Sequence, residues 1–126
     1  MRSILALLRR PKPDKDALGV RALRRRGVDV TQPVMLRHYL YFAFEYEARV
    51  VAAQLGQQGF DIDVRDAPMN SGILVLARRS EIPACDTIHE IRTSLSELAQ
   101  SQKGEYDGWE AEFSSGKAIA GAAART

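Results

Sequence analysis

The most informative segment for the fold is Gly104-Glu105-Tyr106-Asp107-Gly108-Trp109-Glu110-Ala111-Glu112-Phe113, which holds the only tryptophan of the chain. In its second half, Trp109, Ala111 and Phe113 alternate with glutamates. Such alternation predicts a strand that is buried on one face only. Gly108 predicts either a β-bulge or a close backbone approach within it, because glycine packs no side chain and weakens a regular strand. We therefore expect this stretch to form the last strand of a sheet.

Three strands and two helices are predicted before this last strand. The helical segments carry apolar residues at spacings of three and four, which is typical of helices with one buried face. The strand segments either alternate or are apolar throughout. The strands are expected at 34–42, 60–65 and 73–77, and the helices at 45–58 and 83–102.

The resulting order is strand, helix, strand, strand, helix, strand. With right-handed crossovers, this βαββαβ order predicts an α+β, ferredoxin-like two-layer sandwich: an antiparallel four-stranded sheet with two helices on one face. Residues 34–42 and 73–77 should be the central strands. The domain is expected to span 34–113.

The segments outside that domain differ from it in charge and composition. Residues 1–26 carry nine Lys/Arg and two Asp, which gives this segment a net charge of +7. Because the net charge of the whole chain is +2, residues 27–126 carry a net charge of −5. We expect residues 1–33 to form a basic N-terminal arm with a short helix over 14–26 that packs loosely on the domain or projects from it. The arm could meet nucleic acid, anionic lipid or an acidic partner, although a solvated face explains the same charges. Residues 114–126, which are mostly small, should form a flexible tail.

The block Glu105-Tyr106-Asp107-Gly108-Trp109, which follows an amphipathic helix, resembles the signature of the regulator of ribonuclease E activity B family. That resemblance also implies a ferredoxin-like fold. It implies a cytoplasmic protein that binds an RNA-degrading endonuclease similar to ribonuclease E and inhibits or modulates it by protein–protein contact. The contact would be with an arginine-rich region of the nuclease. The residues expected to bind the partner are Glu105, Tyr106, Asp107, Gly108, Trp109 and Glu110.

Charge and aromatic content give this partner a physical rationale, because carboxylates bind guanidinium groups bidentately and aromatic rings stack on them. The alternative is a stand-alone ferredoxin-like binding module, which can be oligomeric, for a peptide or small ligand and with no nuclease target. We expect no direct sequence-specific binding of nucleic acid. Tyr39 and Tyr41 could stack bases, but residues 73–77 contain no aromatic side chain and the acidic domain repels phosphate.

The chain shows no signature of catalysis. Cys85 and His89 lie one helical turn apart without further ligands, so we expect no metal site, no cofactor, no catalytic residues and no enzyme. A single cysteine is typical of a reducing cytosol. The apolar run 4–8 is far too short to span a bilayer, so no membrane association is expected.

Overall fold

The computed structural model describes residues 15–112. Residues 1–14 of the predicted arm, the predicted strand end Phe113 and the predicted tail 114–126 lie outside the described residues. The elements, in chain order, are α2 (Lys15–Arg25), β1 (Val34–Phe42), α3 (Glu45–Gln57), β2 (Asp61–Asp66), the 3-10 turn η1 (Pro68–Asn70), β3 (Ile73–Glu81), α4 (Cys85–Ser101) and β4 (Glu105–Glu112).

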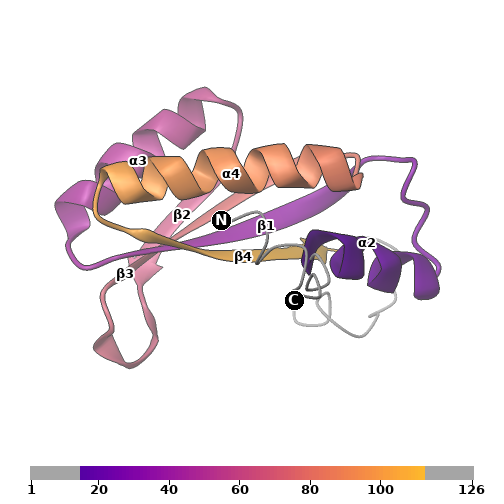
Figure 1. The fold of residues 1–126 in the computed structure, drawn as a ribbon. Coiled ribbons are helices and arrows are strands. Elements are labelled where there is room, and N and C mark those ends of the chain that lie inside the picture. Colours follow the sequence, from indigo (N-terminus) through magenta and orange to yellow (C-terminus); the bar gives the residue numbers. More distant parts are fainter. Residues whose placement is uncertain (1–14, 113–126) are drawn as a thin grey trace, which may run out of the picture.

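The four strands form one antiparallel sheet in the order β2-β3-β1-β4. Helices α3 and α4 lie side by side on one face of this sheet, and no helix within residues 15–112 covers the other, open face (Figure 1). The predicted ferredoxin-like sandwich is therefore confirmed, as are the central positions of β1 and β3. Strand β3 extends past the predicted end at residue 77, as far as Glu81.

The main core lies between the sheet and the two covering helices. Ala48, Val51 and Leu55 of α3 are fully buried, as the helical spacing predicts. They meet Leu95 and Ala99 of α4 and the inward residues of the central strands. Burying each large aliphatic side chain stabilises the fold by roughly 1.5–3 kcal/mol. The buried strand residues of this cluster are Leu40, Phe42, Val75 and Ala77.

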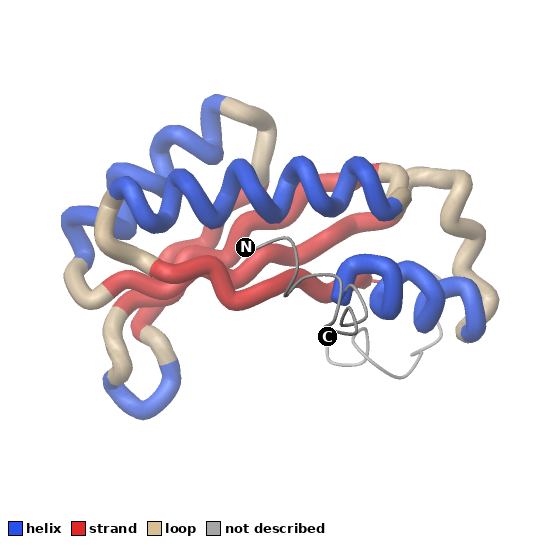
Figure 2. The backbone as a smooth tube through the Cα atoms, viewed as in Figure 1, coloured by secondary structure: helices blue, strands red, loops and turns tan. Residues whose placement is uncertain are grey.

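Helix α2 packs against the sheet beside β4, as the tube view also shows (Figure 2). Val20 and Leu23 are only 5% and 6% exposed, and they form a second cluster with Leu36, Ile88 and Ala111. The expectation of loose packing or projection is therefore wrong. The buried face of α2 also carries a glycine and an aspartate, so hydrophobic periodicity underestimated how much of this face is buried.

Gly19 of α2 allows the close approach of Trp109, and this gives a paired prediction. A Cβ atom at Gly19 would lie 2.7 Å from Trp109 Cζ2, whereas one at Gly56 of α3 would meet nothing within 4 Å. Alanine is preferred over glycine in helices by about 1 kcal/mol. We therefore expect Gly56→Ala to raise the free energy of unfolding by about 0.5–1 kcal/mol. Gly19→Ala should lower it by about 1–2 kcal/mol, because the overpacking cost exceeds the helix gain.

Urea denaturation of both variants measures these opposite shifts. Stabilisation by Gly19→Ala similar to that by Gly56→Ala would mean that α2 does not pack closely on Trp109.

Candidate functional site

Strand β4 contains the predicted β-bulge. Its register against β1 pairs His38 with Trp109 and Leu40 with Tyr106, so β4 has one residue more than β1 between these pairs. Gly108 lies in this interval with φ +111°, a backbone conformation that residues with a side chain rarely adopt. Of the two alternatives predicted for Gly108, the bulge is confirmed, whereas a Cβ atom there would meet nothing within 4 Å.

The bulge turns both aromatic residues of the block toward the helices. In a regular strand, residues three apart point to opposite faces, but the additional residue places Tyr106 and Trp109 on the same face. Tyr106 packs against the main core, which includes Leu95, whereas Trp109 packs in the cluster with α2. The cluster around Trp109 takes Ile88 from α4, whereas Ile91, Leu95 and Leu98 belong to the main core. Because β4 runs antiparallel to α4, Tyr106 lies near the end of that helix and Trp109 near Ile88 at its start.

A buried carboxylate joins Trp109 to α2 and α4. The indole Nε1 of Trp109 donates to Asp16 Oδ1 at 3.1 Å, and Arg92 Nε donates to Asp16 Oδ2 at 2.8 Å. Asp16 is only 1% exposed, so these donors compensate the cost of burying its charge. The three side chains hold α2 in place.

Tyr106 is bonded within the domain. Its hydroxyl lies 2.9 Å from His38 Nδ1, and the His38 side chain is completely buried. Burial, together with the nearby charge of Arg79, lowers the pKa of His38 from 6.5 to about 4. Burial also raises the pKa of the Tyr106 hydroxyl. The Tyr106 hydroxyl is thus engaged with the core.

The acidic residues of the block are exposed. Glu105 and Glu110 lie on the open face of the sheet, where they pair in register with Tyr41 and Arg37. Asp107 is exposed within the bulge. Five of the six predicted partner-binding residues therefore divide into three exposed carboxylates and two inward-facing aromatics, and the sixth, Gly108, forms the bulge. These carboxylates can accept hydrogen bonds from a cationic partner, whereas the indole donor of Trp109 is already used.

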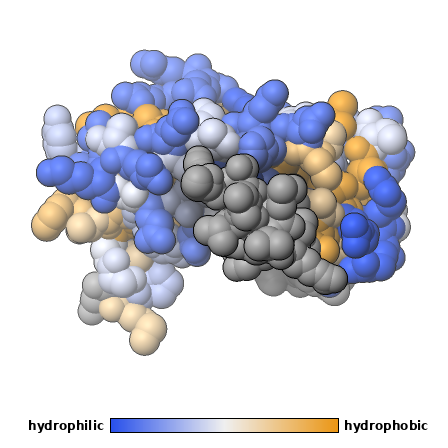
Figure 3. Space-filling model, in the orientation of Figure 1, coloured by the Kyte–Doolittle hydropathy of each residue, from blue (hydrophilic) through white to orange (hydrophobic). Residues whose placement is uncertain are grey.

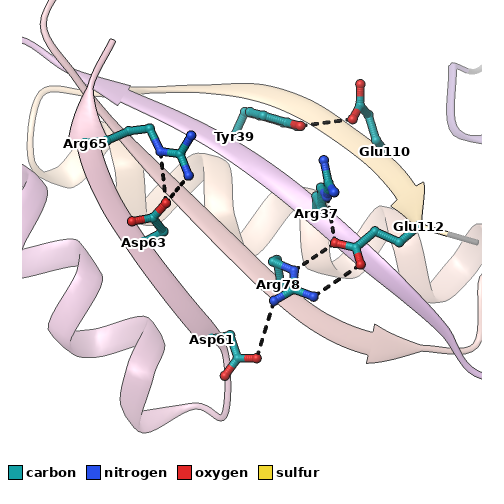
Figure 4. A network of polar contacts seen from close by, with 8 residues as sticks. All are labelled: Arg37, Tyr39, Asp61, Asp63, Arg65, Arg78, Glu110 and Glu112. Carbon is teal, nitrogen blue, oxygen red and sulfur yellow. Dashed lines mark hydrogen bonds and ion pairs between the residues drawn. The ribbon is translucent and has the colours of Figure 1, made fainter. Parts of the chain in front are cut away.

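The open face carries an ion-pair network that the sequence did not reveal (Figure 4). Glu112 accepts from Arg37 Nε at 2.6 Å and from Arg78 Nε at 2.8 Å. These two guanidinium groups, Arg78 first, lower the pKa of the Glu112 carboxyl. Nearby, the Tyr39 hydroxyl donates to Glu110 at 2.9 Å. The further pairs are Arg78–Asp61 and Arg65–Asp63. Because acidic side chains pair with Arg37, Arg65 and Arg78, the positive charges of these arginines are largely neutralised within the sheet.

Two other candidate residues were missed by the sequence analysis. Phe44 and Tyr46, where β1 leads into α3, are 70% and 74% exposed. The available signal was the alternation of aromatic and acidic residues in Phe44-Glu45-Tyr46-Glu47. Helical periodicity ignores such a pattern, because both aromatics lie off the buried face.

Among residues 15–112, no group of three or more His, Cys, Asp or Glu side chains could hold a metal ion. Within the same residues, no helix is long and apolar enough to cross a membrane. Cys85 is exposed.

Comparison with known proteins gives one family. The family model described as regulator of ribonuclease activity B matches residues 14–111, most of the 126-residue chain. The matched segment includes α2 together with the sheet and its two covering helices. No curated protein matches the chain.

Proposed function

The chain belongs to the regulator of ribonuclease activity B family, and from this we propose that it binds an RNA-degrading endonuclease similar to ribonuclease E and inhibits or modulates it. The family match is the observation that carries the proposal, since it supports a regulator of ribonuclease activity in general. In this proposal the protein acts by protein–protein contact in the cytoplasm and is not an enzyme. The identity of the nuclease and the mode of contact are the parts that experiment must test.

The proposed contact is with an arginine-rich region of the nuclease. The charge of −5 over residues 27–126 and the exposure of Glu105, Asp107 and Glu110 support it. Carboxylates bind guanidinium groups through paired, charge-assisted hydrogen bonds. Tyr106 is not expected to stack on the partner, because its ring packs against the core. Trp109 contributes by holding the strand and α2 together.

The test is calorimetric titration with the arginine-rich C-terminal region of the host's own ribonuclease E at low and high salt. We expect the Kd to rise with salt, because exposed charges are screened over about 8 Å at physiological ionic strength. A triple variant, Glu105→Gln, Asp107→Asn and Glu110→Gln, should bind about tenfold more weakly, since each exposed pair contributes roughly 0.2–1 kcal/mol. Its melting temperature should change little.

A matched control removes the same charge from α4 through Asp86→Asn, Glu90→Gln and Glu97→Gln, three residues that are also exposed. Equal weakening by the two triple variants would show that binding depends on net charge alone and does not use the β4 block. No heat at low salt, with both proteins folded, would leave the nuclease assignment without support.

The alternative function, a binding module for a peptide or small ligand, has one feature in its favour. The open face of the sheet has a shallow depression of about 410 Å³, whose lining includes Leu74, Leu76 and Arg65. Failure of the nuclease titration would favour this alternative, and the depression is where a ligand should then be sought.

A further inference from the structure

Two aromatic side chains stand out by their exposure. Phe44 and Tyr46 are 70% and 74% exposed, whereas every other aromatic residue within 15–112 is buried or partly buried. A core or strand-packing role therefore does not explain them. Exposed aromatic residues of this kind are enriched at protein–protein interfaces, where a few of them supply most of the binding energy.

Phe44 also occupies a position where another residue type would stabilise the fold. It is the N-cap of α3, with extended backbone angles (φ −129°, ψ 152°), and no side chain caps the helix there. Serine, threonine, aspartate and asparagine are strongly preferred at this position, because their oxygen accepts a hydrogen bond from the first turn. The sequence thus lacks both a cap and a buried ring at residue 44. Local departures of this kind are expected at functional sites.

The charges around the two rings specify the chemistry of a partner. Glu45 lies between them and is exposed, with an ion pair to Arg49 at 3.1 Å, and Glu47 follows in the same turn. A guanidinium group can stack on a ring while it donates to a neighbouring carboxylate. The same carboxylates would repel an anionic lipid surface. They would also repel their own copies in a symmetric dimer.

This surface is continuous with the end of the sheet at which the acidic block begins. Glu105 pairs in register with Tyr41, close to the end of β1. The β2–β3 hairpin reaches the same end: a Cβ at Gly72 would lie 3.5 Å from Ala43 Cα, and the hairpin carries Met69, which is 94% exposed. Figure 3 shows apolar surface at this end, over the start of α3 and on the hairpin.

We propose that Phe44 and Tyr46, with Glu45 between them, form the docking surface for an arginine-rich segment of the partner nuclease. This inference rests on the proposed function and assigns it a place in the fold. The rings stack on guanidinium groups and Glu45 binds them by charge. The acids at the start of β4 extend the surface electrostatically. Tyr106 and Trp109 of β4 face inward. The aromatic rings that stack on the partner are therefore those of Phe44 and Tyr46.

The variant that tests this is Phe44→Ser combined with Tyr46→Ser, titrated against the arginine-rich C-terminal region of ribonuclease E. We expect the Kd to rise about tenfold, the loss expected for two exposed stacking contacts. The melting temperature should stay unchanged or rise, because serine at residue 44 can cap α3. The matched control is Ile82→Ser, an apolar residue that is 45% exposed at the opposite end of β3. It should leave the Kd unchanged.

A second titration uses the same nuclease segment with every arginine replaced by lysine. Lysine lacks the planar group that stacks on rings, so the difference in Kd between the wild type and the double variant should shrink severalfold. An undiminished difference would show that the rings do not act by stacking on arginine.

The outcomes separate the two proposals. If the wild type gives no heat, the proposed function fails and this inference fails with it. If the wild type binds and the Phe44→Ser/Tyr46→Ser variant binds equally well, only the docking surface is wrong. Sedimentation of the wild type alone tests whether the same surface instead binds a second copy of the chain. Self-association that disappears in the double variant would assign the surface to a second copy of the chain and overturn the inference.

Discussion

Replacing Trp109 by alanine is expected to lower the free energy of unfolding by about 3 kcal/mol and to release α2 from the domain. Removal of a core tryptophan costs 3–5 kcal/mol, and partial exposure of this side chain favours the lower end. The ring fills the space beside Gly19 and packs with Val20 and Leu23. Without it, Asp16 also loses the indole donor at 3.1 Å. The change should therefore destabilise α2 more than the rest of the fold.

Urea denaturation measures the global loss, and amide hydrogen exchange over residues 16–25 measures the release of α2. Trp109→Phe is the informative control, because it keeps one aromatic ring but removes the hydrogen bond to Asp16 and part of the packing beside Gly19. It should cost about 1.5–3 kcal/mol, the range for a bond to a charged group. A second control is Phe44→Ala, which removes an exposed ring and should change stability little. Unchanged protection of α2 in Trp109→Ala would contradict the proposed packing.

The second large effect is a loss of stability in mild acid that comes from His38. Burial holds the pKa of this imidazole at about 4 in the folded protein, whereas the ordinary value is 6.5. Between these values the unfolded chain binds a proton that the folded protein does not. Stability is therefore complete above pH 6.5 and falls as the pH drops toward 4, by about 2–3 kcal/mol in all.

Melting temperatures from pH 8 to pH 4 measure this effect. The chain holds two histidines, so the controls are simple: His38→Gln should flatten the profile between pH 6.5 and 4, and His89→Gln should not. The carboxyl of Glu112, whose pKa is lowered by Arg78 and Arg37, acts in a lower window. Its contribution is lost only below its ordinary value of 4.5. A flat wild-type profile down to pH 4.5 would contradict the assignment to His38.

The stability losses expected at Trp109 and at His38 concern different parts of the fold, and both help to separate stability from partner binding. Neither Trp109 nor His38 is expected to contact the partner, because both face the helices. Binding should therefore follow the folded fraction in these variants, whereas the variants of Phe44, Tyr46 and the β4 acids should lose affinity while folded. Comparing stability and affinity across all variants separates scaffold residues from contact residues.

Local patterns in the sequence determined the arrangement of the domain. The strands and helices from residue 34 to residue 112, the central positions of β1 and β3, and the buried faces of α3 and α4 follow from apolar spacing and chain order. The bulge followed from one glycine in a strand. Each of these features depends on residues that are close in sequence or on the topological rule for crossovers. The amino-acid sequence alone therefore suffices to predict these features.

Only the tertiary structure decided which surfaces the candidate residues occupy. The contact between Asp16 and Trp109 joins residues 93 positions apart, and the bond between Arg37 and Glu112 joins residues 75 apart. No local pattern encodes such pairs. The bulge then placed Tyr106 and Trp109 together on the inner face, and the packing of α3 left Phe44 and Tyr46 in solvent. Fold class depends on the period of apolar residues, whereas a binding surface depends on which side chains the packed core leaves exposed.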